Sequence, residues 1–454
     1  MSPHRRQMVI GWLMTAGGAH RAAWTTHAGQ PDPCGSIAAF VEMAQDAERA
    51  KLDYIFHADW PSLRPGAPDE VARNTSYVNH LEPLTLMSAL AMATSNIGLV
   101  ATASTSYSEP YTLARQLASL DHLSGGRAGW NIVTGRSPMA AFNYGHASEI
   151  PHAERYQVGE EFVDVVRGLW DSFEDDAFIR DVERGFYFDP SKLHTLNHNG
   201  KHFKVRGPLN ISRSPQGYPV LFQAGASDTG IQLGGRVGEV LFAVHKYIEP
   251  AQEYYRTVRA KAAEFGRSPD DVRVCAGLEV IVRESQAEAE DAFEEMQAKL
   301  HPEAIKHVVA GDIEADISDL GVDDLLTLDR LPKEANSSKS SDKVIRSWLE
   351  KEQMTVRQFF NRFGSRGAHA IYGTPKQVAD RMEEWFTAEA TDGFMMFFPL
   401  PSGMRDFGSM VIPELQRRGL FRTEYTGNTF RDSLGLERPP HRIHSEASLE
   451  RLRA

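Results

Sequence analysis

The sequence predicts an α/β fold, a (β/α)8 barrel of the TIM type with insertions. Eight short apolar runs with strand character lie between residues 8 and 398, and most of them are followed by a helix pattern. Residues 82–134 show the order helix, strand, helix, strand with short connections, which is typical of a parallel sheet built from βαβ units. Several strands are apolar first and polar at their carboxyl ends, where parallel barrels place their chemistry.

The expected strands are apolar runs bounded by polar or glycine-containing segments. They are residues 8–13, 54–59, 99–101, 130–134, 220–224, 240–244, 272–282 and 394–398. The first run follows Arg5 and Arg6, and this combination also resembles a twin-arginine or secretory signal. We favour the strand, because the sheet needs it in order to close into a barrel.

The expected helices begin at residues that suit a first helical turn. Ser36 precedes an apolar pattern at helical spacing, and Pro83 and Pro110 stand where a missing N–H is tolerated. Gly125 ends the helix that Pro110 begins. Further helix patterns cover residues 251–265 and 375–388.

The chain reads as one barrel domain over residues 1–454. Insertions are expected at about 173–217 and 301–367, because these segments do not fit the repeating strand–helix unit. From about residue 422 to 454 the chain is polar and charged, which indicates a tail on the surface or on a partner subunit.

Composition excludes several classes of function. The chain has 454 residues, of which 41% are hydrophobic and 24% charged, as in ordinary globular proteins. Its formal net charge of −12 argues against binding of nucleic acid or of an anionic membrane as the main function, and no apolar run is long enough to span a bilayer. Cys34 and Cys275 lack metal-ligand spacing and are expected to be free thiols in a reducing, cytoplasmic compartment.

Polar residues gather at five strand ends. His57 and Asp59 end the second strand, and Ser104 and Thr105 follow the third. The other ends carry Asn131 and Thr134, the 225–228 turn, and the pair His245 and Lys246. A carboxylate after four apolar residues is costly unless it is paired or has a function, so we expect a functional mouth. The alternative is that each of these residues only caps a strand.

Two features at this rim suit an anion. The Gly225–Ala226–Ser227 turn joins a strand to a helix, where backbone N–H groups and the helix dipole favour a phosphate. His152 and Tyr156 are four residues apart and therefore share a helix face. The alternatives are a glycine turn without a ligand and a solvated helix face beside Arg155.

Other chemistries find little support. The second strand ends in His57-Ala58-Asp59, whereas a two-metal barrel hydrolase would place His-x-His there, so no metal site is expected. No Gly-x-Ser-x-Gly elbow and no Rossmann or P-loop glycine motif is present.

Motifs along most of the chain carry a family resemblance. They are Phe56-His57-Ala58-Asp59, Glu82-Pro83, and segments 103–110, 118–134, 223–227 and 413–421. They resemble the bacterial luciferase-like flavin monooxygenase family, most closely the subgroup of nitrilotriacetate monooxygenase component A, pristinamycin synthase and dibenzothiophene-sulfone monooxygenase.

The resemblance implies reduced FMN (FMNH2) at the barrel mouth and an FMNH2-dependent, two-component monooxygenase. In such enzymes the reduced flavin meets O2 and forms a peroxyflavin, which oxygenates a small organic substrate. By motif position, Asp59, Ser104, Thr105 and Asn131 would lie near the isoalloxazine ring. His152, Tyr156 and Ser227 would hold the phosphate.

The partners implied are a separate NAD(P)H:flavin reductase and further copies of the chain, as a dimer or tetramer. No catalytic base is assigned, because His20, Trp24 and His57 serve equally well as packing or capping residues. The loops 18–35 and 61–80 and the 301–367 insertion are expected to form the substrate pocket.

Three alternative functions stay open at this point. They are a deazaflavin-dependent oxidoreductase of the same fold, a phosphometabolite isomerase or lyase on a similar barrel, and a flavin-binding or structural protein without turnover.

Overall fold

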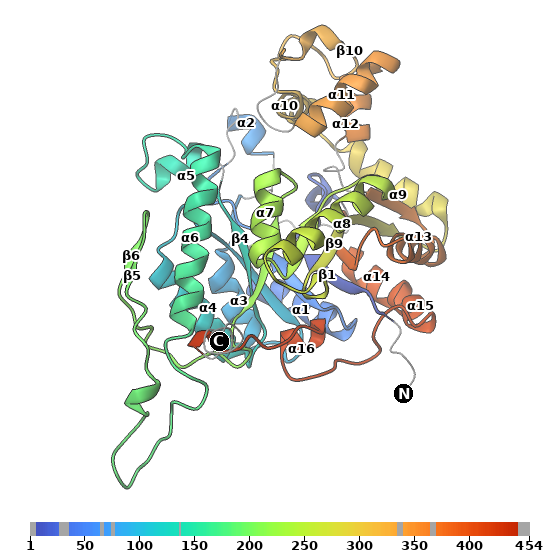
Figure 1. Ribbon diagram of the computed structural model, residues 1–454. Helices are drawn as coiled ribbons and strands as arrows, with labels where there is room; N and C mark the ends of the chain where they lie inside the picture. The colour runs from blue at the N-terminus through green and yellow to red at the C-terminus, as the bar shows by residue number, and fades with distance from the viewer. Residues whose placement is uncertain are drawn as a thin grey trace.

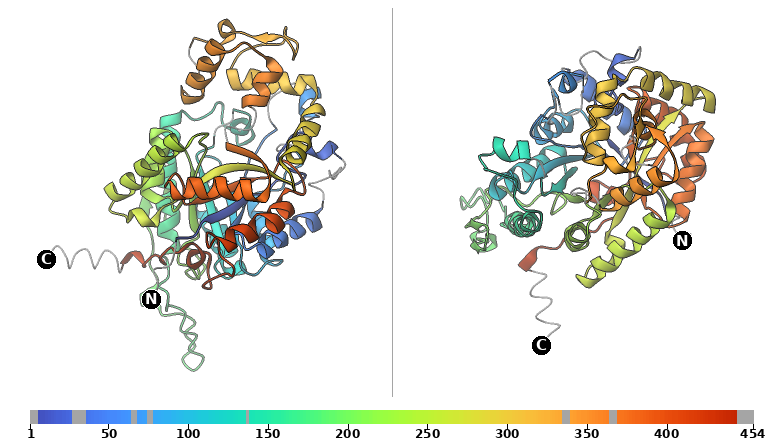
Figure 2. Two further views of the ribbon diagram at one scale, coloured as in Figure 1. Left: turned by 90° about the vertical axis from the view of Figure 1, so that its right-hand side faces the viewer. Right: turned by 90° about the horizontal axis from the view of Figure 1, so that it is seen from above.

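The computed structural model describes residues 6–26, 36–63, 68–73, 78–135, 138–333, 339–363 and 369–443. Within them, eight parallel strands form a closed ring with helices outside it (Figures 1 and 2). The ring consists of β1 Val9–Leu13, β2 Tyr54–His57, β3 Gly98–Ser104, β4 Ala128–Val133, β7 Val220–Ala224, β8 Val240–Ala243, β9 Arg273–Val282 and β13 Gly393–Phe397. The predicted barrel and its eight strands are therefore confirmed.

A further strand, β12 (His369–Gly373), joins the sheet and was not predicted. β9 has ten residues, which is longer than any other strand of the ring. Its first half pairs with β8, its middle with β13, and its end with β12. β12 thus pairs with the part of β9 that extends past the ring.

Helices alternate with the strands. They are α1 Ile37–Arg49, α3 Pro83–Ala91, α4 Pro110–Ser124, α6 His152–Trp170, α7 Asp228–Val237, α8 Ile248–Glu264, α9 Gln286–Ala298, α13 Pro375–Thr387, α14 Gly403–Met410 and α15 Ile412–Arg417, with the short α2 Pro68–Val71 and α5 Pro138–Asn143.

The helix ends follow local chemistry. The Glu82 carboxylate accepts hydrogen bonds from the backbone N–H groups of Leu84 and Thr85 at the start of α3. Gly125 ends α4 with φ +69°, a conformation that favours glycine. Ser36 precedes α1 as predicted, but its side chain makes no capping hydrogen bond.

The amino-terminal end of the barrel interior is filled by a side chain from beyond the last strand. Phe430, on α16 (Phe430–Leu434), is fully buried and packs on Phe222 and Tyr54 with ring-centroid distances of 6.0 and 6.1 Å. The backbones of Gly98 and Gly129 leave room for its ring, because a Cβ on Gly98 would lie 2.5 Å from it. Part of the segment expected to be a surface tail therefore belongs to the core.

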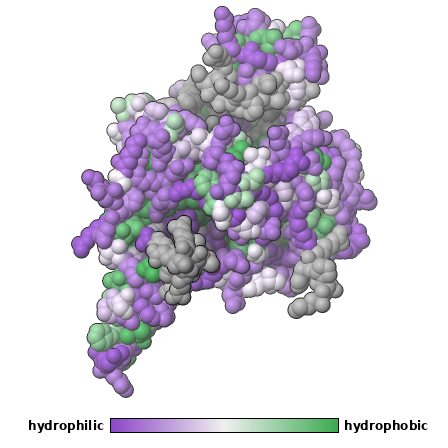
Figure 3. All heavy atoms as spheres, viewed as in Figure 1, coloured by the Kyte–Doolittle hydropathy of each residue, from purple (hydrophilic) through white to green (hydrophobic). Residues whose placement is uncertain are grey.

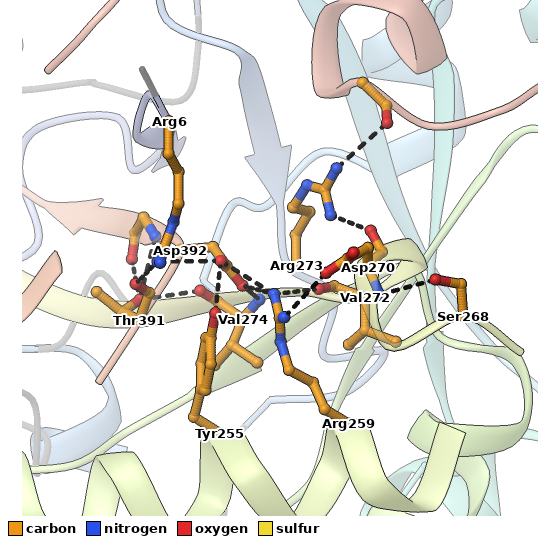
Figure 4. Close-up of polar contacts among 12 residues, drawn as sticks. Arg6, Tyr255, Arg259, Ser268, Asp270, Val272, Arg273, Val274, Thr391 and Asp392 are labelled. Atoms are coloured by element: carbon orange, nitrogen blue, oxygen red, sulfur yellow. Dashed lines mark hydrogen bonds and ion pairs between the residues drawn. The ribbon is translucent and has the colours of Figure 1, made fainter. Parts of the chain in front are cut away.

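A buried carboxylate joins several elements at this same end (Figure 4). Asp392 accepts hydrogen bonds from the Val274 backbone N–H at 2.9 Å, from the Tyr255 hydroxyl at 3.0 Å and from Arg259 at 3.2 Å. The Arg6 guanidinium lies 3.2 Å from it. Because it is buried and has several donors, Asp392 links the segment before β1 to α8 and to β9.

The 301–367 region contributes a small unit above the barrel mouth (Figures 1 and 2). Its described elements are α10 Pro302–Ile313, β10 Leu325–Leu326, α11 Lys339–Lys351, β11 Met354–Thr355 and α12 Val356–Phe363. The unit has an apolar core of its own, which includes Val309, Ile345 and Phe359. Lys246, after β8, places its ammonium 4.9 Å from the Trp348 ring and so ties α11 to the mouth.

The 173–217 region forms an arm that projects from the end of the molecule opposite to the 301–367 unit (Figure 1). Phe173, Phe178 and Phe188 pack together inside it, and β5 (His198–Asn199) pairs with β6 (Lys204–Val205) along its return. Figure 3 shows apolar side chains on the outside of this arm. On this arm, Val182 is 92% exposed and Tyr187 is 65% exposed.

Two further findings concern the described residues only. No helix among them is both long and apolar enough to cross a membrane. No group of three or more histidine, cysteine, aspartate or glutamate side chains among them is placed to hold a metal ion. Cys275 is a buried free thiol, while Cys34 lies outside the described residues.

Candidate functional site

The carboxyl ends of the strands form the barrel mouth, and five of the seven predicted site residues lie on or just after them. Ser104 is the last residue of β3, and Asn131 lies in β4. Asp59 follows β2, and Ser227 follows β7 and caps α7. The prediction that these strand ends meet at one rim is therefore confirmed by the topology.

Asn131 lies inside the barrel. Its register partner in β3 is Thr102, and the Asn131 amide nitrogen donates to the Thr102 hydroxyl at 3.0 Å. Both side chains are buried. This hydrogen bond fixes the plane of the amide, so a flat ligand above it would meet a donor and acceptor of fixed direction.

Ser104 and Thr105 lie where the loops after β3 and β4 approach each other. The Thr105 backbone N–H donates to the Val133 carbonyl at 2.9 Å, and the Ser104 hydroxyl accepts from the Ser106 N–H at 3.2 Å. A Cβ on Gly159 of α6 would lie 3.2 Å from the Thr105 hydroxyl oxygen. The small residue on α6 therefore lets this helix pack closely against the end of β3.

His152 and Tyr156 lie together in the first turns of α6. Their ring centroids are 4.9 Å apart with an interplanar angle of 45°, so the predicted shared face is confirmed. His152 is exposed, and Tyr156 is half-buried against the main core.

Arg155, between them in sequence, was expected on a solvated face in the alternative interpretation, and this is wrong. Its side chain is buried, and one Nη donates to the Gly135 carbonyl at 2.9 Å and also pairs with Glu149. Arg155 therefore fastens the first turn of α6 to the loop after β4. Sequence patterning missed this residue because an arginine beside a glutamate at a helix start is usually solvent-exposed.

The turn before α7 is narrow because of two glycines. A Cβ on Gly225 would lie 3.1 Å from the Gly230 Cα, and a Cβ on Gly230 would lie 3.0 Å from the Gly225 backbone. The Ser227 hydroxyl accepts from the Gly230 N–H at 3.2 Å and is hydrogen-bonded to the Thr229 hydroxyl at 3.2 Å. Ser227 itself is exposed at the rim.

Two helix amino termini therefore lie at neighbouring positions on the rim. α6 follows β4 and α7 follows β7, and these two strands are paired. Arg236 of α7 and Asp164 of α6 form an ion pair of 2.6 Å, which shows that the helices are neighbours along their length. Helix amino termini carry partial positive charge and free N–H donors, so these residues fit the phosphate of a mononucleotide cofactor.

Asp59 is half-buried on the loop after β2. Burial raises the pKa of its carboxyl above the ordinary value of 3.8, an effect that nearby His80 opposes and Glu82 reinforces. A raised pKa at a cleft residue is a common mark of functional sites, although it also occurs in structural ones.

His57 packs outside the barrel wall, not in its mouth. Its ring stacks on His80 at 4.4 Å, meets Phe40 of α1 edge-on at 6.2 Å, and its Nε2 lies 3.2 Å from the Leu81 carbonyl oxygen. Burial, followed by the charge of His80, lowers the pKa of His57 to about 4. Its surroundings thus favour the packing role over that of a base.

A cavity of about 100 Å³ lies beside the mouth, between the loop after β1, the loop after β2 and the α9–α10 junction. Trp24 forms one wall, and His20 lies close by with its ring 6.1 Å from that of Phe293. The lining includes five basic residues that the sequence did not reveal as a group. They are Arg21, Arg73, Lys299, His301 and His307.

Comparisons with known proteins match the chain over most of its length. The family model described as "Luciferase-like monooxygenase" matches residues 14–392. The chain is 43% identical to N-acetyl-S-(2-succino)cysteine monooxygenase of Bacillus subtilis (strain 168), with 97% of this chain and 99% of the relative covered. It is 42% identical to nitrilotriacetate monooxygenase component A of Aminobacter aminovorans, with 96% and 98% covered.

A solved structure is also similar to the chain over most of its length. The crystal structure of the riboflavin lyase RcaE with modified FMN and riboflavin superposes with a TM-score of 0.83 at 31% identity. The similarity covers 95% of this chain and 97% of that one.

Proposed function

The chain belongs to the luciferase-like monooxygenase family, and from this premise we propose that it is the oxygenase component of a two-component FMNH2-dependent monooxygenase. It would take reduced FMN from a separate NAD(P)H:flavin reductase and use O2 to oxygenate a small organic substrate. When bound, reduced FMN supplies the reactivity toward O2.

One observation carries the proposal: two helix amino termini, those of α6 and α7, are adjacent on the rim of the barrel. We propose that the flavin phosphate binds between them. The residues that would hold it are His152, Tyr156 and Ser227.

The rest of the cofactor would then extend over the barrel mouth. Four residues from the ends of the neighbouring strands β2, β3 and β4 would lie near the isoalloxazine ring: Asp59, Ser104, Thr105 and Asn131. The amide of Asn131, fixed by Thr102, would orient the ring, and the unit above the mouth would exclude water from it.

We further propose that the protein acts as a homo-oligomer, either a dimer or a tetramer. Support comes from the arm at 173–193, which exposes the apolar side chains Val182 and Tyr187. We also propose a cytoplasmic location, since the NAD(P)H that drives the reductase is found there.

An anaerobic titration tests the cofactor assignment. We expect FMNH2 to bind with higher affinity than a deazaflavin, and admission of O2 together with a substrate to yield oxygenated product. Preference for the deazaflavin would instead identify a deazaflavin-dependent oxidoreductase. Failure to bind any flavin would favour a phosphometabolite isomerase or lyase.

Oxygen uptake tests the substrate. A purified flavin reductase and NADH would supply the reduced flavin, and sulfones, amines and aminopolycarboxylates would be compared. An active oxygenase gives product in proportion to the O2 consumed. Flavin binding followed by uncoupled oxidation with every compound would indicate a flavin-binding protein without turnover.

A further inference from the structure

Strand β9 carries a carboxylate that lies outside the proposed cofactor site. Glu279 is the only aspartate or glutamate within the eight ring strands as the structure describes them. Every second residue of a strand faces the same side of a sheet, so Glu279 shares its side with Cys275 and Gly277. Cys275 belongs to the apolar cluster around Phe430 inside the ring. Glu279 therefore also faces the barrel interior.

The level of Glu279 along β9 places it in the barrel mouth. A Cβ on Gly277 would lie 3.2 Å from the rings of Phe242 and Phe397, whose centroids are 5.9 Å apart. Glu279 lies two residues further toward the carboxyl end of β9, with Phe397 as its register partner in β13. Its side is half-buried, so part of the residue reaches solvent. Two aromatic rings thus form a floor, and the carboxylate stands at the edge of this floor.

A tyrosine holds the carboxylate in place. The Tyr372 hydroxyl of β12 donates to Oε1 of Glu279 at 2.5 Å, and the Tyr372 ring stacks on Phe293 of α9 with centroids 4.6 Å apart. Burial, followed by the charge of Glu279, raises the pKa of the Tyr372 phenol well above its ordinary value of 10, so the phenol stays a donor. A carboxylate has about four acceptor positions, so it can accept hydrogen bonds beyond the one from Tyr372.

β9 lies across the ring from the strands of the proposed flavin site. In one direction β13, β1 and β2 separate it from β3, and in the other direction β8, β7 and β4 do so. The residues proposed to surround the flavin ring lie at the ends of β2, β3 and β4. A substrate beside that ring would therefore occupy the part of the mouth that Glu279 faces.

We propose that Glu279 selects the substrate by accepting a hydrogen bond from an N–H or O–H group of it, and that Tyr372 positions the carboxylate for this contact. The rings of Phe242 and Phe397 would pack against the apolar part of the same molecule. Such a site rejects an analogue that lacks the donor, because the analogue displaces water and leaves acceptor positions empty. The inference rests on the proposed function for the role of the ligand as substrate, whereas its binding is measurable without flavin.

A ligand-observed NMR titration of the purified full-length protein tests the site with three probes of similar shape: benzylamine, benzyl alcohol and toluene. We expect benzylamine, which is cationic near neutral pH, and benzyl alcohol to bind more tightly than toluene. A further preference for the amine over the alcohol would support an ion pair, and equal binding of the two would support a neutral hydrogen bond. Toluene bound as tightly as the other two, or no binding of any probe, would overturn the proposal.

Two substitutions test the roles of the pair. Glu279→Gln should raise the dissociation constant of benzylamine about tenfold, as loss of a charge-assisted hydrogen bond implies, and leave that of toluene unchanged. Tyr372→Phe keeps the ring that stacks on Phe293 and removes the hydroxyl, so it should lower the preference for benzylamine over toluene about threefold. A purely structural role of Tyr372 would change both constants alike. An unchanged preference in both variants would overturn the proposal.

Glu389→Gln is the matched control. Glu389 is exposed just before the start of β13, at the other end of the strands, and its substitution removes the same charge. It should leave the dissociation constants of all three probes unchanged.

An FMN titration of the same wild-type protein separates the two proposals. Flavin binding without a preference for the donor-bearing probes would remove only the assignment of Glu279. That preference in a protein that binds no flavin would remove only the oxygenase assignment.

Discussion

Ser227 and Tyr156 approach the proposed phosphate site from different helices. Ser227 caps α7 with its hydroxyl, and Tyr156 lies on the first turns of α6 beside His152. Each would contribute one hydrogen bond to the phosphate, and such a bond contributes about 1 kcal/mol net.

We predict that Ser227→Ala and Tyr156→Phe each weaken FMN binding by about 1 kcal/mol, or roughly fivefold. Quenching of flavin fluorescence on binding measures this directly. Phe142→Leu, at an exposed position of α5, serves as the control with unchanged affinity. Unchanged affinity in both site variants would remove the phosphate assignment.

The buried side chain of His57 leads to a second prediction, which concerns how the stability of the fold depends on pH. Its pKa falls from 6.5 in the unfolded chain to about 4 in the folded one, so between these values the unfolded state binds more protons. Its contribution to stability is therefore present above pH 6.5 and is lost as the pH falls toward 4. Once the pH is below 4, this residue has lowered the free energy of unfolding by about 3 kcal/mol.

Chemical denaturation at several pH values checks this. The free energy of unfolding of His57→Gln should fall less on acidification than that of the wild type, because glutamine keeps a donor for the Leu81 carbonyl but does not titrate. His146→Gln, at an exposed position, should follow the wild-type curve. Parallel curves for His57→Gln and the wild type would show that this pKa is not lowered.

Individual residues of the site differ in how far the sequence reveals them. The Ser227 cap and the His152–Tyr156 pair follow from local spacing, and the structure has both. Arg155 escaped notice because its burial depends on the loop after β4. The basic lining of the cavity escaped notice because its members come from the loop after β1, the loop after β2 and the α9–α10 region, which only the closed barrel brings together.

Among the secondary-structure elements, β12 was not predicted, and its partner strand β9 shows why. A long strand over residues 272–282 was expected, and β9 has ten of these eleven residues, but the pairing of its last five residues was not expected. They pair with β12, a run of five residues that includes His369, Tyr372 and Gly373 and has no apolar alternation to mark it. Pairing with an existing strand, not its own sequence, makes β12 a strand.

The Asp392 cluster gives a prediction about how the elements are held together (Figure 4). Asp392→Ala should lower the free energy of unfolding by about 3 kcal/mol, because it leaves buried donors from α8 and β9 without an acceptor. Urea denaturation measures the change. The matched control is Asp270→Ala.

Asp270 pairs with the same arginine, Arg259, but is 89% exposed. Exposed ion pairs contribute little to stability, so Asp270→Ala should lower the free energy of unfolding by about 0.5 kcal/mol or less. Equal effects of the two substitutions would show that burial of Asp392 does not matter.

On the scale of the whole molecule, the sequence predicted the barrel and its eight strands because each strand carries its own apolar signal. The family resemblance drawn from the motifs is confirmed by the family model and by relatives that cover nearly the whole chain. The burial of Phe430 could not be foreseen in the same way. It stands in a polar, charged segment, and only contact with β2, β3 and β7 gives it a place in the core.

The projecting arm gives the last prediction. Val182→Asp combined with Tyr187→Asp should lower the oligomeric state, since charged side chains disfavour burial of this surface between copies. Light scattering after size-exclusion chromatography measures the molar mass. Met92→Asp changes another exposed apolar side chain, on the barrel body, and should leave the mass unchanged. A wild-type protein that is monomeric would contradict the prediction.

The position of Phe430 has a consequence for biosynthesis. A ribosome makes all eight strands before it makes this residue, so the nascent barrel has a gap among Tyr54, Gly98 and Phe222 until translation has passed the last strand by more than thirty residues. Folding of the ring to its final density therefore follows release of the carboxyl-terminal segment from the exit tunnel. A chain cut just after β13 would carry every strand and yet keep a void the size of a phenyl ring at its base.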